Sequence, residues 1–253
     1  MGWSYDFWKG KFYPNKTASK DYLVYYAMQF NTVEVDNTFY RIPTQSTVSN
    51  WKQQTPNGFL FSLKFPRMIT HVKMLRDCQR ETEIFLKRVD LLGEKLGVLF
   101  LQFPPNFGIE HLPDLEGFLH KLPPQHHYVV EVRNAGWLNK EFYSILNANR
   151  VALAWTDSSL MAEIIEVTAD FLYVRWEGER KKINGTLGKI EVDRAGELKL
   201  EAERIKPYIG KMDIFGYFSK YYSGYPPSDI ANIKDYLSVP KGSSQRTKEA
   251  GKG

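Results

Sequence analysis

The sequence predicts an α/β fold in which parallel strands alternate with helices. Three observations support this class: seven short apolar segments each end on or near a polar residue, helix-like stretches lie between most of them, and the chain has 253 residues. This length is typical of a (β/α)8 barrel, although the alternation also fits an open doubly wound sheet. Both folds bind ligands at the carboxyl ends of their strands. The polar endings therefore predict a functional site.

Each predicted strand combines an apolar body with a polar ending. The strands span Thr32 to Asp36, Leu60 to Lys64, Val98 to Gln102, Tyr128 to Arg133, Val151 to Asp157, Phe171 to Arg175 and Ile214 to Ser219. Only Met1, Gly2 and Trp3 stand where an eight-stranded barrel would have its first strand. We therefore expect that strand to be missing or truncated, and the seam between the first and last predicted strands to be incompletely covered.

Helices are predicted from apolar residues spaced three and four apart and from start and stop signals. Thr44 is suited to be an N-cap, Gly93 stops the helix before it, and a Pro-Pro pair ends another. The predicted helices span Lys20 to Phe30, Thr44 to Gln54, Cys78 to Leu92, Leu112 to Leu122, Lys140 to Asn147, Glu197 to Ile209 and Ser228 to Leu237. The connection after Asp157 is too short for a full crossover helix, and Glu177 to Gly196 is predicted to be a loop insertion.

The composition predicts a cytoplasmic protein with one large core. Hydrophobic residues make up 43% of the chain, with no apolar run of 18 residues and no basic, apolar leader. These features argue against a membrane span and a secretory signal. Cys78 is the single cysteine, so no internal disulfide is possible.

The net charge of +5 at pH 7 is concentrated in the last residues. Residues 240–253 hold four basic side chains and one acidic side chain and lack apolar periodicity, so we expect a disordered tail after a single domain over 1–239. The domain keeps a charge of only +2. Binding of nucleic acid is therefore only weakly supported.

Several motifs occur in one order along the chain. They are GWSY, W-x-G-x-FYP, F-N-T-V-E-V with TFYR, K-F-P-R-x-I-T-H, L-F-L-Q-F-P-P, Y-V-V-E-V-R, W-T-D-S, Y-V-R-W-x-G and G-Y-F-S. Together they resemble the YecE-like family, also called domain of unknown function 72, from Gly2 to Leu237. The resemblance implies a TIM-like barrel of unestablished biochemical function. Its members usually carry a pair of asparagines or Asn-Asp where this chain has Ser219, Lys220 and Tyr221.

Residues two apart on a strand share a face, which predicts that the polar endings point into the barrel. The charged members of this inward set are Glu34, Asp36, Lys64, Glu131, Arg133, Asp157 and Arg175. One interpretation is an active site in which the charges tune one another's pKa values. The other is a network of ion pairs that fills the polar end of the barrel without chemistry.

The candidate catalytic residues are Glu131, Glu34 and Asp157, with Glu131 first as general acid or base. The two arginines suit bidentate binding of phosphate or carboxylate. Nearby acids are expected to raise the pKa of Lys64, which favours an anion contact or a structural role over Schiff-base chemistry. Aromatic residues could stack on a base or sugar. The candidate ligand contacts are Lys64, His71, Gln102, Arg133, Trp137, Arg175, Trp176 and Tyr217.

No metal or cofactor is required by the sequence. A single Mg²⁺ or Mn²⁺ held by His71 with Glu34, Glu131 and Asp157 is an alternative. The arginines favour an enzyme, a hydrolase or lyase, acting on a small anionic ligand that is phosphorylated or a nucleotide, or on nucleic acid. A glycosidase-like hydrolase with paired acids and a non-catalytic ligand-binding or regulatory barrel are the competing hypotheses.

Overall fold

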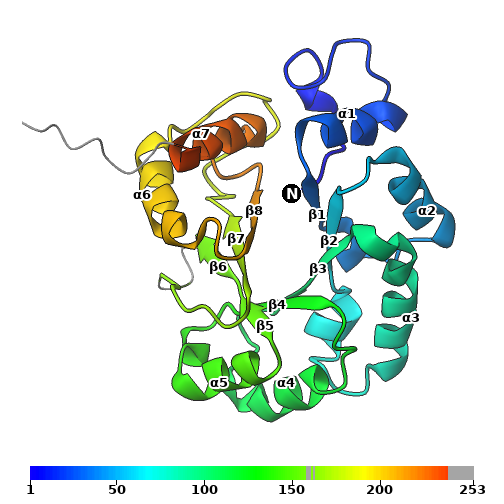
Figure 1. Cartoon of the computed structure of the whole chain (residues 1–253), viewed down its shortest axis with the longest axis vertical. Helices are drawn as coiled ribbons and strands as arrows, with labels where there is room; N and C mark the ends of the chain where they lie inside the picture. Colours follow the sequence, from blue (N-terminus) through cyan, green and yellow to red (C-terminus); the bar gives the residue numbers. More distant parts are fainter. Residues whose placement is uncertain (158–160, 162, 239–253) are drawn as a thin grey trace, which may run out of the picture.

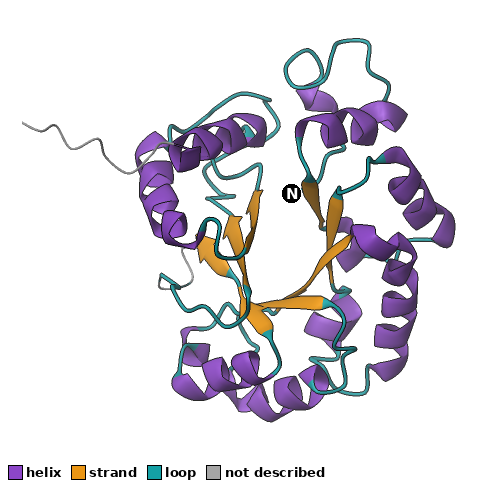
Figure 2. Ribbon diagram, in the orientation of Figure 1, coloured by secondary structure: helices purple, strands orange, loops and turns teal. Residues whose placement is uncertain are grey.

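The computed structural model describes residues 1–157, 161 and 163–238. In this part of the chain eight short strands curve around a common axis, and the helices lie outside them (Figures 1 and 2). The strands are β1 (Thr32–Val35), β2 (Leu60–Lys64), β3 (Leu96–Gln102), β4 (His127–Glu131), β5 (Val151–Leu153), β6 (Trp155–Asp157), β7 (Phe171–Trp176) and β8 (Asp213–Phe218). This arrangement confirms the predicted α/β class with a barrel-like course of the strands.

All recorded strand pairs are parallel, in two sheets with the orders β1-β2-β3-β4-β5 and β6-β7-β8. The two sheets are continuous along the chain, because only Ala154 separates β5 from β6. The Ala154 N–H donates to the carbonyl of Val130 at 2.9 Å. The predicted strand from Val151 to Asp157 therefore exists, with a break that lets the sheet change direction.

Within the described residues the α-helices agree with the prediction in number and order. They are α1 (Tyr22–Gln29), α2 (Gln45–Gln54), α3 (Gln79–Val89), α4 (Leu112–Leu119), α5 (Lys140–Ala148), α6 (Ala195–Ile205) and α7 (Pro226–Ser238). The Oγ1 atom of Thr44 accepts a hydrogen bond from the Thr47 N–H at 3.1 Å, which confirms the predicted N-cap. Helix α6 ends at Ile205, before the predicted Ile209, and the chain continues as a 3₁₀ turn over Lys206–Tyr208, because Pro207 has no backbone N–H to extend the α-helical hydrogen bonds.

None of the described helices is long and apolar enough to cross a membrane. The predicted tail, 240–253, lies outside the described residues.

In the described part of the chain, no ladder of backbone hydrogen bonds connects β1 to β8 across the seam. The hydroxyls of Thr32 and Tyr217 lie 2.7 Å apart across it. Met1 and Gly2 lie between the two strands, where Figure 1 marks the N-terminus. The Gly2 N–H donates to the Glu34 carbonyl at 2.8 Å, and the Met1 amino group donates to the Phe218 carbonyl at 2.8 Å. The first two residues thus cover part of the seam.

Apolar side chains pack on both faces of the strands. The larger cluster lies between the strands and the surrounding helices. The smaller one fills the barrel interior and includes Val98, Phe100, Val129, Ala152, Ala154, Tyr173 and Phe215. This packed interior closes the barrel below its carboxyl end, so the polar residues above it rest on a hydrophobic floor.

Candidate functional site

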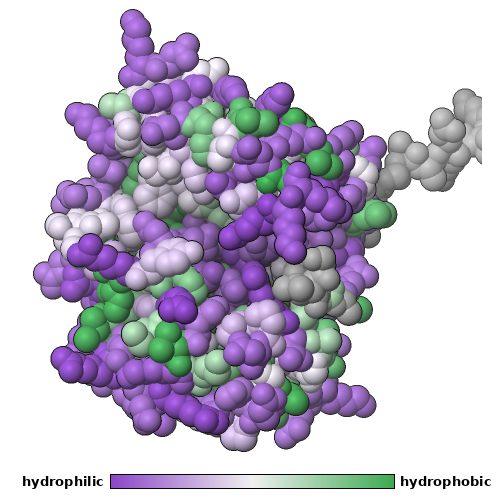
Figure 3. Space-filling view, turned by 180° about the vertical axis from the view of Figure 1, so that it is seen from behind, coloured by the Kyte–Doolittle hydropathy of each residue, from purple (hydrophilic) through white to green (hydrophobic). Residues whose placement is uncertain are grey.

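A cavity of about 1060 Å³ opens at the carboxyl ends of the strands. The face turned to the viewer in Figure 3 is hollowed near its middle, and hydrophilic side chains gather there. The lining residues come from the strand ends and from the loops that follow them. They include Met1, Tyr5, Asp36, Phe39, Tyr40, Lys64, Arg67, His71, Gln102, Arg133, Arg175, Glu177, Arg180, Lys181, Ser219, Lys220 and Tyr221.

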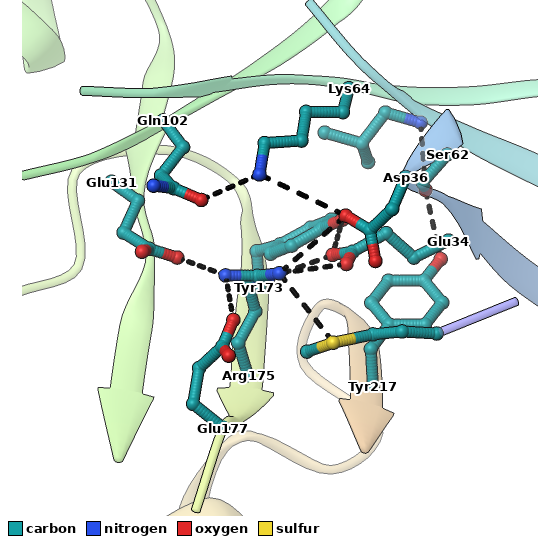
Figure 4. A network of polar contacts seen from close by, with 12 residues as sticks. Glu34, Asp36, Ser62, Lys64, Gln102, Glu131, Tyr173, Arg175, Glu177 and Tyr217 are labelled. Atoms are coloured by element: carbon teal, nitrogen blue, oxygen red, sulfur yellow. Dashed lines mark hydrogen bonds and ion pairs between the residues drawn. The ribbon is translucent and has the colours of Figure 1, made fainter. Parts of the chain in front are cut away.

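Arg175 is the centre of the polar network beneath this cavity (Figure 4). Its side chain is 2% exposed, and its guanidinium group lies 4.4 Å above the ring of Phe100. Nε and Nη2 each donate to the Glu34 carboxylate at 2.9 Å. Nη1 lies 2.5 Å from oxygens of Glu131 and Glu177. Carboxylates thus occupy every nitrogen of the group, which argues against the predicted role of Arg175 as an anion ligand.

Glu34 and Glu131 are held as buried carboxylates by this pairing. Burial alone would raise the pKa of each, but the Arg175 guanidinium acts together with other nearby cations and hydrogen-bond donors, and their combined effect outweighs burial and lowers the pKa of both groups. The Tyr173 hydroxyl also donates to Glu34 at 2.6 Å. A general acid requires a raised pKa, so neither residue suits that role. The glycosidase-like hypothesis loses support for this reason.

Arg133 and Glu177 extend the network toward the cavity. Arg133 follows the end of β4, where its Nε donates to Glu131 at 2.9 Å and its Nη2 lies 3.7 Å from Glu177. The Arg133 side chain is 24% exposed and lines the cavity. Arg133 therefore keeps donor capacity that Arg175 lacks.

Asp36 lines the cavity and has a raised pKa. Burial and the Glu34 carboxylate raise the pKa of Asp36 to about 6, although Arg175 and Lys64 act against them. Its Oδ1 atom is buried and finds no hydrogen-bond partner among the described residues. A carboxyl group that titrates near neutrality beside a cavity is suited to general acid or base chemistry. The sequence placed Asp36 in the inward set but left it off the catalytic candidates.

Lys64 differs from its predicted state. Its Nζ donates to Gln102 Oε1 at 2.6 Å and lies 3.9 Å from Asp36. Burial and the positive charge of Arg175 lower the pKa of Lys64, despite opposing effects of the carboxylates. The expectation that this pKa would be raised was wrong, because desolvation of the buried amine, with help from Arg175, outweighs the effect of the acids Asp36, Glu131 and Glu34.

His71 borders the cavity as predicted, in a turn formed by Met68–Val72. Its Nδ1 lies 2.9 Å from the Thr70 hydroxyl. Burial, followed by the charges of Lys64, Arg67 and Arg133, lowers the pKa of His71 to about 4. The imidazole is therefore neutral at pH 7.

Filling the cavity with an anion is expected to raise the pKa of His71, because the anion offsets the neighbouring cations. NMR titration of the imidazole resonances, with and without saturating inorganic phosphate, measures this change. The free protein should titrate near 4. An unchanged titration in the presence of bound phosphate would place the anion away from these cations.

The loop from Glu177 to Arg194 carries further cavity residues. Gly178 has φ of +67°, and a Cβ atom there would lie 2.1 Å from the Tyr221 carbonyl oxygen. The next residue, Glu179, donates its N–H to the same carbonyl at 3.0 Å. Glycine thus permits the loop to pack on the connection after β8. This packing positions Arg180 and Lys181 at the cavity.

Asp157 is not part of the cavity lining, and the prediction that it points inward was wrong. The small residues Ala152 and Ala154 take the inward positions, so Trp155 and Asp157 face outward. The charged groups that influence Asp157 are Arg194, Glu201, Glu197 and Glu179. Its pKa is raised, with burial as the main cause.

The two tryptophans predicted to stack on a ligand are packing residues instead. Trp137 is fully buried, stacks on Phe107 and donates its indole N–H to the Phe107 carbonyl at 2.6 Å. Trp176 stacks on Phe218 on the outer face, and its indole N–H lies 3.3 Å from Glu201. Neither ring lines the cavity.

Tyr217 points inward but lies below the cavity. Its hydroxyl lies 2.7 Å from the Thr32 hydroxyl and 2.8 Å from the Ser62 hydroxyl, so it joins β8 to β1 and β2.

The predicted metal ligands do not lie together, because Asp157 faces away from the others. Across the described ranges no group of three or more His, Cys, Asp or Glu side chains is arranged to hold a metal ion.

Sequence reasoning missed six charged residues of the cavity. Glu177 could have been found, since it continues the alternation of Tyr173 and Arg175. The other five lie on loops, where alternation gives no direction: Arg67, Glu179, Arg180, Lys181 and Lys220.

The fold and the site define a class: a TIM-barrel-like α/β protein with a charged cavity at the carboxyl ends of its strands. The sequence matches the family described as "Protein of unknown function DUF72" over residues 1–251, and the chain belongs to this family. It is 40% identical over 115 residues to the UPF0759 protein YecE of Escherichia coli K12, covering 46% of this chain and 42% of YecE. It is 30% identical over 154 residues to the UPF0759 protein YunF of Bacillus subtilis, covering 58% and 54%. The matches thus span about half the length of these curated relatives.

Two solved structures share the fold. A DUF72 family protein of Thermotoga maritima superposes with a TM-score of 0.78 at 24% identity, covering 94% of this chain and 97% of that one. A DUF72 family protein of Enterococcus faecalis gives a TM-score of 0.73 at 20% identity, covering 88% and 96%. These similarities establish the architecture and leave the activity open.

Proposed function

We propose that the protein is an enzyme, a hydrolase or lyase, that binds a small phosphate-bearing ligand in the strand-end cavity. The observation that supports this proposal most strongly is the charge of the side chains that line the cavity. Besides Arg175, which buried carboxylates neutralise, the described lining holds six basic side chains against the acids Asp36, Glu177 and Glu179. Glu177 is paired with Arg175, and Glu179 with Lys182 and Arg194. The remaining positive charge favours an anion.

The size of the cavity supports a small molecule. Ligand pockets typically enclose roughly 300 to 1,000 Å³, and this cavity of about 1060 Å³ lies just above that range. Arg133 is the best-placed anion ligand, because Glu131 and Glu177 orient its guanidinium while part of the side chain stays exposed to the cavity. The cations on the loops then enclose the ligand.

The change from Arg133 to alanine is expected to weaken binding of inorganic phosphate by about tenfold or more. A hydrogen bond to a charged group contributes roughly 1.5 to 3 kcal/mol, and about 1.4 kcal/mol corresponds to tenfold in affinity. Isothermal titration calorimetry at low ionic strength measures the effect, with circular dichroism to confirm folding. Arg80→Ala is the matched control, since Arg80 is exposed on α3 and does not line the cavity. Equal affinity in wild type and both variants would refute the proposal.

A further inference from the structure

Lys64 occupies an unusual position for a lysine. It ends β2, lines the cavity and is only 12% exposed. Its Nζ lies 4.6 Å from the centre of the Phe39 ring and 5.6 Å from that of Phe100. Within the described part of the chain the one hydrogen bond of Nζ goes to the neutral amide oxygen of Gln102. The direct contacts of the amine are therefore two aromatic rings and an uncharged amide.

The acids around Lys64 are hydrogen-bonded to arginines, with the exception of Asp36, whose Oδ1 lies 3.9 Å from Arg175 Nη2. Glu34 is paired with Arg175, and Glu131 with both Arg175 and Arg133. Asp36 alone combines closeness to Nζ, at 3.9 Å, with access to the cavity. The Asp36 oxygen at that distance is the one without a hydrogen-bond partner among the described residues. In Figure 4 the Lys64 amine and this carboxyl group point toward each other.

We infer that Lys64 is an amine nucleophile that forms a Schiff base with the carbonyl carbon of an anionic aldehyde or ketone, with Asp36 as the proton donor. This inference rests on the proposed function and specifies its substrate class. The basic residues at the rim hold the anionic group, and Lys64 lies deeper, where a carbonyl several bonds away would reach it.

The step balances in atoms and electrons. The lone pair of the neutral Nζ attacks the carbonyl carbon, and the carbon–oxygen π electrons move to oxygen. A proton passes from nitrogen to that oxygen, which gives a carbinolamine. The Asp36 carboxylic acid then protonates the hydroxyl, water leaves, and the nitrogen lone pair forms the C=N bond. The products are a protonated imine on Lys64, one water molecule and the Asp36 carboxylate, and nothing is oxidised or reduced.

The electrostatics of the two groups fit their roles. Desolvation and a neighbouring cation are the two ways in which proteins make a lysine nucleophilic, and burial with Arg175 lowers the pKa of Lys64. A proton donor works best when its pKa lies near the working pH, and that of Asp36 is about 6. The imine charge and the new carboxylate would also attract each other.

Reductive trapping tests the inference. The protein is incubated with dihydroxyacetone phosphate or glyceraldehyde 3-phosphate and then reduced with borohydride, and the modified lysines are located by peptide mass spectrometry. Wild type is expected to carry the adduct at Lys64 in at least tenfold excess over any other lysine. Lys64→Arg, which keeps a long basic side chain but has no nucleophilic amine, should lose it. Asp36→Asn should slow trapping by about 10²-fold without lowering the melting temperature.

The outcomes separate this inference from the proposed function. If phosphate binds in an Arg133-dependent manner but neither probe labels Lys64 preferentially, the Schiff-base inference is overturned and anion binding stands. If dihydroxyacetone, which lacks phosphate, labels Lys64 as fast as its phosphate ester, the lysine chemistry stands and the anion proposal fails. Unchanged trapping in Asp36→Asn would remove Asp36 as the proton donor and overturn that part.

Discussion

Replacing Arg175 with methionine is expected to lower the free energy of unfolding by about 3 to 5 kcal/mol, because it leaves buried carboxylates without their partner. Glu34 and Glu131 are almost fully buried, and both depend on the Arg175 guanidinium. Urea unfolding at pH 7, followed by circular dichroism, measures the loss. Methionine keeps much of the side-chain length, so the missing charge dominates the effect.

The pH dependence gives this prediction a distinct signature. In the wild type the pKa of Glu34 and of Glu131 is lowered, so their stabilising effect is fully present above the ordinary value of 4.5 and is lost as pH falls below it. In the variant the unpaired carboxylates should have raised pKa values, because burial disfavours the charged form. Their destabilising effect then grows as pH rises above 4.5. The difference between the two proteins should therefore shrink from pH 7 to pH 4.

Arg133→Met is the matched control for the Arg175 variant. Arg133 contacts two of the same carboxylates but is 24% exposed, so we expect a loss of about 1 kcal/mol or less. If Arg175→Met unfolded at the same urea concentration as wild type, the network would not stabilise the fold.

Glu131→Gln is expected to lower the free energy of unfolding by about 3 kcal/mol. The Glu131 carboxylate accepts from Arg175 through one oxygen and from Arg133 through the other. The side-chain amide of the variant keeps one oxygen as an acceptor. Its NH2 group, a donor, then faces the guanidinium group of an arginine, which is also a donor. A thermal melt at pH 7 shows the effect, and Glu177→Gln is the control, because Glu177 pairs with the same arginine at the cavity edge with 15% exposure.

A different outcome would change the role of Glu131. If Glu131→Gln kept the wild-type melting temperature and phosphate affinity but trapped a carbonyl probe about 10²-fold more slowly, Glu131 would be a catalytic residue. A large drop in melting temperature with normal trapping in the folded fraction would make it structural.

The sequence predicted the strands and their polar endings well, because both depend on local alternation. Leu60 to Lys64 matches β2 residue for residue. The partners of those endings could not be predicted, since Glu34 and Arg175 lie 141 positions apart in the chain. Only the closure of the barrel brings them within hydrogen-bonding distance.

The error at Asp157 concerns which face of its strand points inward. For Val151 to Asp157 we took the polar ending as the guide, whereas side-chain volume decides. Phe100 and Tyr173 already fill the interior and stack on each other, which leaves room there only for Ala152 and Ala154. Trp155 must then pack outside, against Tyr208, and Asp157 follows it. Small residues alternating with large ones were the signal that could have corrected the assignment.

The loop from Glu177 to Arg194 carries cavity residues that are independent of the buried charge network on the strands. The buried charges lie on strands, where any change disturbs the fold. Arg180 and Lys181 instead lie on a loop. Two backbone hydrogen bonds hold this loop in place, from Glu179 to Tyr221 and from Glu191 to Ser223. Sequence changes between these anchors leave the strand network untouched. Substitutions in the loop can therefore change which ligand is bound during evolution while the buried groups keep their positions. Proteins with this one fold can in this way come to accept different molecules.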